Sequence, residues 1–166
     1  EGLDAERAET AALLHDLCRN FSNDEMLQAA ANYGIAIDGF AALKPMLLHG
    51  PVAAEESKRI FGIDDPEVYE AVYVHTTGMP GMGLIARALY VADFSEPNRN
   101  YPEATRAREI FAAEGLHSAL LYVAAEKTNN HARTASLDPN TRAFLEWLRE
   151  GCDLPPRAST PAEDLP

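Results

Sequence analysis

Hydrophobic residues recur every three or four positions along most of the chain, which is the period of an amphipathic helix. The stretch from Leu84 to Phe94 is apolar on nearly every side and predicts a central, buried helix. The pattern as a whole predicts eight helices, over residues 3–18, 22–33, 51–61, 66–75, 84–94, 103–113, 116–133 and 139–150.

Residues typical of helix starts precede several of these stretches. Asp4 is an N-cap candidate, and Ser22 with Glu25 forms the sequence of a capping box. Asp65 and Pro66 give a third start signal, with proline at a first helical position. These local signals support the boundaries that the hydrophobic period predicts.

No stretch shows the strict alternation of a half-buried strand. We therefore predict a single all-α domain over residues 1–150, a helical bundle with short connections. The last segment, 151–166, contains four prolines and little apolar periodicity, and is expected to form an extended or disordered tail.

Length and charge narrow the classes of function. The chain has 166 residues, 46% of them hydrophobic, which suits one folded domain. A net charge of -12 disfavours binding of a nucleic acid but permits a small phosphorylated ligand in a pocket whose field is reversed by metal ions or arginines.

Cellular location follows from what the sequence contains. Its cysteines, Cys18 and Cys152, are read as reduced thiols of a cytoplasmic protein. No apolar run reaches the roughly 18 residues of a membrane span, and no secretory pattern opens the chain. The chain starts at Glu1 in mid-pattern, so an N-terminal segment is expected to be missing from this sequence.

Five polar residues stand out against the helical background: His15, Asp16, His49, His75 and Asp93. Imidazole and carboxylate together suit iron, manganese, cobalt or zinc, and a carboxylate that bridges two ions suits a binuclear hydrolytic centre. The alternative is structural: a His-Asp pair satisfied by hydrogen bonds, and single histidines at helix ends. Asp93, in an apolar helix, needs a cation or hydrogen-bond donors in either case.

The order of the motifs H-D, H-G-P-V, H-T-T-G-x-P-G-M and V-A-D-F-x-E-P-x-R resembles the HD-domain metal hydrolases, specifically the YqeK type, which are symmetrically cleaving diadenosine-tetraphosphate hydrolases. The resemblance runs from about Ala11 to Leu148. The two longer strings are far more specific than the H-D pair. Together they favour the metal interpretation over the structural one.

Site roles follow from this resemblance. It implies that His15 and Asp16 bind metal with Asp16 bridging two ions, that His49 and His75 bind the second ion, and that Asp93 binds the first. Arg99 is implied at the phosphate side of the cleft. The substrate-binding and catalytic residues expected on this basis are Thr77, Gly78, Asp16, Arg19 and Arg99.

The chain departs from the family pattern at three places. Residues 1–14 lack the histidine expected upstream of the H-D pair, so either that segment lies outside this sequence or the first ion is weakly held. Met79 stands where a basic residue is common, and Arg19 where a lysine is common. The phosphate contacts are therefore expected to be redistributed.

The leading hypothesis is metal-dependent hydrolysis of diadenosine tetraphosphate to two ADP, by water activated between two transition ions. We expect iron first, then manganese or cobalt. A second hypothesis keeps the metals and changes the substrate to a deoxynucleotide, an alarmone or a cyclic dinucleotide. A third is a non-catalytic module that binds metal or nucleotide. Neither a homodimer nor a monomer is favoured.

Overall fold

The computed structural model describes residues 2–132 and 138–151. These residues form helices and connecting turns, and no strand occurs among them. The elements are α1 Ala5–Leu14, α2 Asn23–Asn32, α3 Gly39–Leu43, the 3-10 helix η1 Pro45–Leu48, α4 His49–Phe61, α5 Pro66–Val74, α6 Leu84–Phe94, α7 Pro102–Glu114, α8 Leu116–Ala132 and α9 Pro139–Arg149. The prediction of an all-α fold is confirmed.

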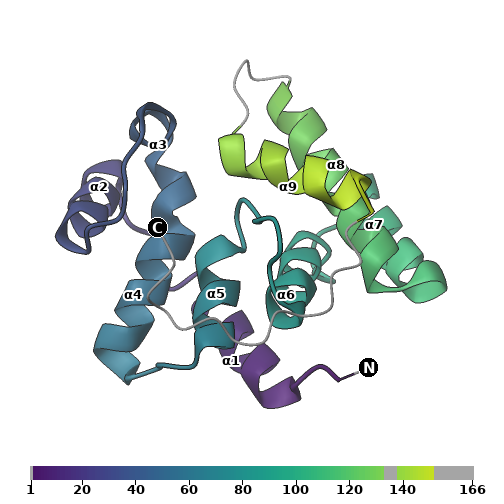
Figure 1. The fold of residues 1–166 in the computed structure, drawn as a ribbon, viewed down its shortest axis with the longest axis horizontal. Coiled ribbons are helices and arrows are strands. Elements are labelled where there is room, and N and C mark those ends of the chain that lie inside the picture. The colour runs from purple at the N-terminus through teal and green to yellow at the C-terminus, as the bar shows by residue number, and fades with distance from the viewer. Residues whose placement is uncertain (1, 133–137, 152–166) are drawn as a thin grey trace.

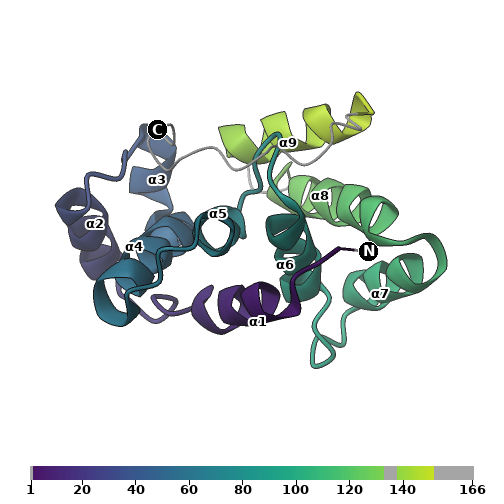
Figure 2. The same ribbon diagram turned by 60° about the horizontal axis from the view of Figure 1, so that its bottom comes forward.

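Helices α4, α5 and α6 lie next to one another, and α1 packs across all three (Figure 1). On one side of the molecule α2 and η1 pack on α4, and α3 packs on η1. On the other side α8 packs on α6, and α7 and α9 pack on α8 (Figure 2). The ends of α1, α4, α5 and α6 therefore meet near the middle of the fold.

The starts of the helices follow the predicted caps. Asp4 accepts hydrogen bonds from the Glu6 and Arg7 amides. Ser22 and Glu25 form the complete capping box, with each side chain bonded to the other residue's backbone amide. Asp65 caps α5 in the same way as Asp4 caps α1. Each cap satisfies amides that have no partner inside the helix, which fixes where the helix begins.

Two predicted boundaries are wrong. The first helix ends at Leu14 rather than at Cys18, because the backbone from His15 onward closes tighter turns, with Leu17 N bonded to Leu14 O and Arg19 N bonded to Asp16 O. No helix was predicted between residues 33 and 51, whereas α3 and η1 occupy Gly39–Leu48 and α4 starts at His49 instead of Pro51. The other helices begin and end within about one residue of the prediction, as far as the described residues reach.

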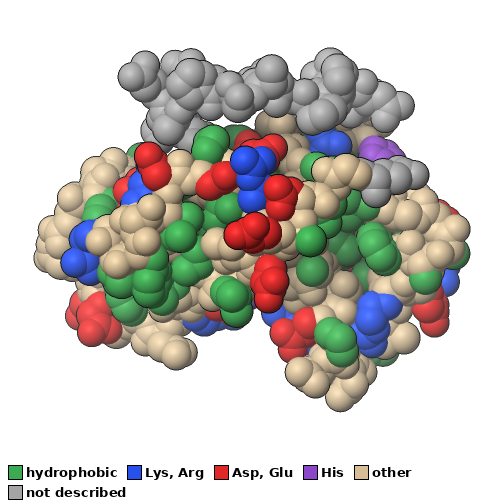
Figure 3. All heavy atoms as spheres, turned by 90° about the horizontal axis from the view of Figure 1, so that it is seen from below, with side chains coloured by type: hydrophobic (Ala, Val, Ile, Leu, Met, Phe, Trp, Pro, Cys, Tyr) green, Lys and Arg blue, Asp and Glu red, His purple; other side chains and the backbone are tan. Residues whose placement is uncertain are grey.

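The apolar stripe predicted over 51–61 is only partly buried. Val52 and Ala53 are fully buried, whereas Ile60 and Phe61 are 52% and 55% exposed. Leu13, beside the H-D pair, is 78% exposed, so the apolar stretch that carries this pair is not wholly in the core. Exposed hydrophobic side chains lie among acidic and basic ones on the face of the molecule that Figure 3 shows.

The core is a single cluster centred on α5, α6 and α8. Its largest fully buried side chains include Tyr90, Phe144, Met26 and Met82. Cys18 is buried among them as a free thiol, and burial raises its pKa to about 11. Cys152 and the predicted tail, apart from Gly151, lie outside the described residues. None of the described helices combines the length and apolarity that a membrane crossing requires.

Candidate metal centre

Three histidines sit at helix ends and are held by the same local hydrogen bond. His15 follows α1, His75 follows α5, and His49 opens α4 directly after η1. In each case Nδ1 lies on the carbonyl oxygen three residues earlier: 2.7 Å from Ala12 O for His15, 2.6 Å from Met46 O for His49 and 2.8 Å from Val72 O for His75. A carbonyl only accepts, so each Nδ1 carries the proton.

The Nε2 atoms of the three rings consequently face one small space. His49 Nε2 and His75 Nε2 lie 2.9 Å apart, and the rings of His15 and His75 meet edge to face at 5.0 Å between centroids. His49 and His75 are each 1% exposed, and burial lowers the pKa of both imidazoles below the usual value. Neutral rings with opposed lone pairs repel each other unless a cation lies between them.

Asp16 stands between the histidines, with one carboxylate oxygen toward each side. Its Oδ1 is 3.1 Å from His49 Nε2 and 3.8 Å from His75 Nε2, and its Oδ2 is 3.5 Å from His15 Nε2. Ligand atoms of His15, Asp16 and His75 all lie within 4.8 Å of one another. This arrangement lets one carboxylate serve two neighbouring cations.

Asp93, near the end of α6, completes the cluster on the side of His15. Its Oδ1 lies 3.9 Å from His15 Nε2 and receives a 2.7 Å hydrogen bond from Arg99 Nη2. The half-buried carboxylate thus has the cationic partner that the sequence required. Arg19 lies beside other members of the cluster, with Nη1 3.7 Å from Asp16 Oδ1 and 3.5 Å from His49 Nε2.

The donor set fits divalent transition ions. Three imidazoles that donate Nδ1–H to backbone carbonyls have the tautomer and orientation of metal ligands, since such histidines usually bond their second nitrogen to a carbonyl or carboxylate. Asp16 and Asp93 add negative charge that would balance bound cations. A cluster of histidines with a purely structural role does not need this charge. Mixed imidazole and carboxylate ligands suit iron, manganese, cobalt or zinc.

Two of the predicted substrate residues, Thr77 and Gly78, lie on the turn that follows His75. Thr77 is half-buried, and Gly78 is buried with a φ of 71°. The Gly78 amide bonds to Val74 O at 2.7 Å, which closes the turn in the manner of a left-handed helix cap. An added Cβ at Gly78 would lie 2.3 Å from Phe144 Cδ1, so this glycine is packed against α9. Substrate contact at Thr77 and Gly78 stays a prediction.

Sequence reasoning missed the residues that support the site. Arg108 on α7 donates from Nη1 to the carbonyls of Ser95 and Glu96 at 3.1 Å each and of Arg99 at 3.3 Å, and thereby holds the turn that carries Arg99. Lys127 on α8 donates to the His75 carbonyl at 3.2 Å. Every residue has a backbone carbonyl, so the sequence does not show which carbonyls bind a side chain. The one signal in the sequence was Lys127 itself, a lysine within the largely apolar α8.

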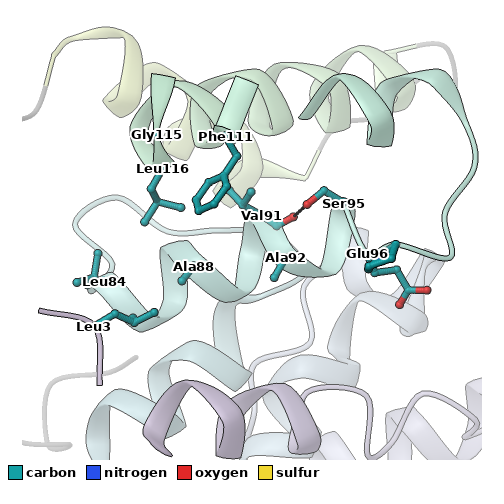
Figure 4. Close-up of a pocket in the computed structure, with 11 residues that line it drawn as sticks. Leu3, Leu84, Ala88, Val91, Ala92, Ser95, Glu96, Phe111, Gly115 and Leu116 are labelled. Carbon is teal, nitrogen blue, oxygen red and sulfur yellow. Dashed lines mark hydrogen bonds between the residues drawn. The ribbon is translucent and has the colours of Figure 1, made fainter. Parts of the chain in front are cut away.

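An apolar groove of about 820 Å³ lies on another face of α6 (Figure 4). Leu84, Ala88 and Val91 of α6 form its floor, Phe111 and Leu116 form one wall, and Leu3 closes one end. None of the five candidate metal ligands lines it. Its lining is mostly hydrophobic and includes the acidic Glu96 but no basic residue, so it does not suit a phosphate group.

Gly50 allows α4 to approach α5 at the metal centre, and we expect Gly50→Ala to weaken both folding and metal binding. A Cβ at Gly50 would lie 2.8 Å from Tyr73 O, 3.0 Å from Val72 O and 3.2 Å from His75 Nδ1. Backbone atoms cannot give way alone, so the helices must separate at a cost of about 1–3 kcal/mol. Urea unfolding and manganese titration measure the two effects.

Gly39→Ala is the matched control, because Gly39 lies in a helix and no atom lies within 4 Å of its added Cβ. It is expected to leave stability and manganese affinity near those of the parent. Equal behaviour of the Gly50 and Gly39 variants would show that α4 and α5 are not in close contact at His75.

Comparison with known proteins gives a family match and several relatives. The HD domain family matches residues 1–119. Over 120 residues the chain is 36% identical to the symmetrical bis(5'-nucleosyl)-tetraphosphatase of Bacillus subtilis, an alignment that covers 72% of this chain and 63% of that protein. The protein of the same name from Staphylococcus aureus is 30% identical over 125 residues, covering 75% and 64%. The chain thus spans less than two thirds of these relatives.

A solved structure supports the fold over most of the chain. The crystal structure of a predicted HD superfamily hydrolase involved in NAD metabolism, from Clostridium acetobutylicum, superimposes with a TM-score of 0.84 at 30% sequence identity. The match covers 89% of this chain and 78% of the other. The helices that carry the histidine and aspartate cluster lie within the family match, and the chain belongs to the HD domain family.

Proposed function

We propose that this chain is a metal-dependent hydrolase that cleaves diadenosine tetraphosphate at its midpoint to give two ADP. The observation that carries the proposal is the convergence of three imidazole Nε2 atoms and two carboxylates on one space. The choice of substrate is supported by the similarity to relatives named symmetrical bis(5'-nucleosyl)-tetraphosphatase.

The cluster divides into two sets of ligands that share Asp16. Asp16 Oδ2 lies near His15, whose Nε2 is also near Asp93 Oδ1, and Asp16 Oδ1 lies near His49 and His75. We assign one ion to each set, with iron expected first and manganese or cobalt as alternatives. Bound divalent ions supply a water of lowered pKa and positive charge for the phosphate oxygens.

The two arginines contact different members of the cluster. Arg19 is half exposed beside Asp16 and His49, and Arg99 is bonded to Asp93 at the edge of the cleft. A guanidinium group can bind two phosphate oxygens at once, so we assign Arg19 and Arg99 to the phosphate groups of the substrate. In this role they neutralise charge on non-bridging oxygens and on the leaving group. We also assign Thr77 to contacts with the phosphate groups of the substrate.

Product analysis tests the proposal. With added manganese, cobalt or ferrous ion, diadenosine tetraphosphate is expected to yield ADP as the sole nucleotide product on chromatography. Protein stripped with a chelator and assayed without metal serves as the control, and elemental analysis of protein purified without a chelator is expected to show two transition ions per chain.

Other products would point to the other hypotheses. Equal amounts of AMP and ATP would contradict cleavage at the midpoint. Turnover of deoxynucleotides, alarmones or cyclic dinucleotides without cleavage of diadenosine tetraphosphate would contradict the substrate assignment. Binding of nucleotide with no turnover at any metal would identify the chain as a binding module. Size-exclusion chromatography with light scattering decides between monomer and homodimer.

A further inference from the structure

Lys127 is a cation that the family match does not include. It lies on α8, beyond residue 119, where the match to the HD domain ends. The side chain is half-buried, and its Nζ donates to His75 O at 3.2 Å and to Thr76 O at 3.4 Å. These carbonyls stand about 50 positions earlier in the sequence, at the end of α5. The contact therefore ties α8 to the residue that presents Nε2 to the metal cluster.

The same ammonium lies on the face of an aromatic ring of α6. Lys127 Nζ is 3.7 Å from the centroid of Tyr90, which is fully buried. Tyr90 stands three residues before Asp93, close to one helical turn. One cation thus contacts both the end of α5, which carries His75, and the helix that carries Asp93.

The end of a helix is a favourable place for this cation. The last carbonyls of α5 lack partners inside the helix and carry partial negative charge. An ammonium between two such carbonyls and a ring face has three directed interactions, which fix the carbonyls relative to the ring. A hydrocarbon side chain would fill the same volume but would leave these carbonyls unbonded.

A second contact from beyond the family match reaches the same turn. Phe144 of α9 is fully buried against Gly78, at the far end of the segment that starts with His75. Lys127 and Phe144 therefore hold the two ends of the turn His75–Gly78 from α8 and α9.

We infer that Lys127 is a positioning residue of the metal centre, which fixes the direction of His75 Nε2 relative to Asp93 by bonding the carbonyls at the end of α5. The inference rests on the proposed metal centre and is independent of the substrate. Lys127 binds neither metal nor phosphate in this role. It acts through the backbone of His75.

Cobalt binding tests the inference without any substrate. Lys127→Met keeps an unbranched side chain and removes the donors, while Arg142→Met removes a cation from the exposed side of α9 and serves as the matched control. Titration with Co²⁺ gives the affinity and the visible absorption spectrum, which reports the geometry of the ligands. We expect Lys127→Met to bind Co²⁺ about 10- to 100-fold more weakly, with an altered spectrum, as is usual when a group that supports a metal ligand is removed.

Lys127→Arg is expected to recover most of the affinity, because a guanidinium donates to two carbonyls and stacks on a ring. A purely structural lysine would give a lower thermal midpoint in Lys127→Met with the parent's Co²⁺ affinity and spectrum, and that result overturns the inference. If Lys127→Met does not fold, Lys127→Ala replaces it with the same expected and overturning results, because alanine also lacks a side-chain donor. A parent protein that binds Co²⁺ but does not cleave diadenosine tetraphosphate would contradict the substrate alone.

Discussion

Asp16→Ala is expected to lose metal and activity together while the helices remain. The Asp16 carboxylate faces His49 and His75 with one oxygen and His15 with the other, so its removal takes a ligand from both proposed ions. Two cations would then lie close together without the negative charge between them. Loss of a group that only hydrogen-bonds a metal ligand lowers metal affinity or activity about 10- to 100-fold. Loss of the shared ligand itself is therefore expected to reduce turnover by more than about 100-fold.

The fold should tolerate this change, because the Asp16 side chain is 42% exposed and lies in the turn after α1 rather than in the core. Elemental analysis, turnover of diadenosine tetraphosphate and circular dichroism measure the three quantities on one preparation. Asp24→Ala is the matched control, since Asp24 is an exposed aspartate on α2. Full turnover in Asp16→Ala would contradict the bridging role.

Helix starts were predictable because their causes are local. The caps at Asp4, Ser22 and Asp65 each act within three residues, so the sequence alone contains both partners of the hydrogen bond. The segment Gly39–Leu48 was missed for the opposite reason. A five-residue helix followed by a 3-10 turn is too short to show a helical period, and its stability comes from packing against α2 and α4.

Hydrophobic period identifies a stripe but not the partner that covers it. Ile60 and Phe61 belong to the stripe of α4 by spacing, yet they lie in its last turn, where no described helix covers them. Leu13 is exposed for a similar reason, beside the point where α1 ends. Burial at helix ends depends on the tertiary arrangement, which spacing does not contain.

The candidate site was partly predictable as well. The residue types and motif order of His15, Asp16, His49, His75 and Asp93 indicated a shared cluster, and these side chains do converge. Their orientation was not predictable, because it depends on hydrogen bonds from Nδ1 to backbone carbonyls. The support from Lys127 was not predictable either, since its partners are carbonyls that every residue possesses.

Gly78→Ala is expected to destabilise the fold more than any other glycine substitution considered. The residue has a φ of 71°, which costs an alanine roughly 1–2 kcal/mol. The added Cβ would also lie 2.3 Å from Phe144 Cδ1 and 2.7 Å from Cε1, against a ring that is fully buried. Overpacking of this kind costs about 1–3 kcal/mol more. The expected loss in the free energy of unfolding is therefore about 2–5 kcal/mol.

Gly81→Ala separates the two causes. Gly81 lies in the same segment with a φ of 80°, but no atom lies within 4 Å of its added Cβ, so only the backbone strain applies. Urea unfolding of both variants, with midpoint and slope fitted separately, measures the difference. Equal losses in the two variants would show that Phe144 does not pack on Gly78. We expect a larger loss in Gly78→Ala than in Gly81→Ala. We also expect Gly78→Ala to cost less in a Phe144→Leu background than in the parent, because a smaller side chain at position 144 leaves room for the new methyl group. These two results together would show that α9 packs against the turn that presents His75.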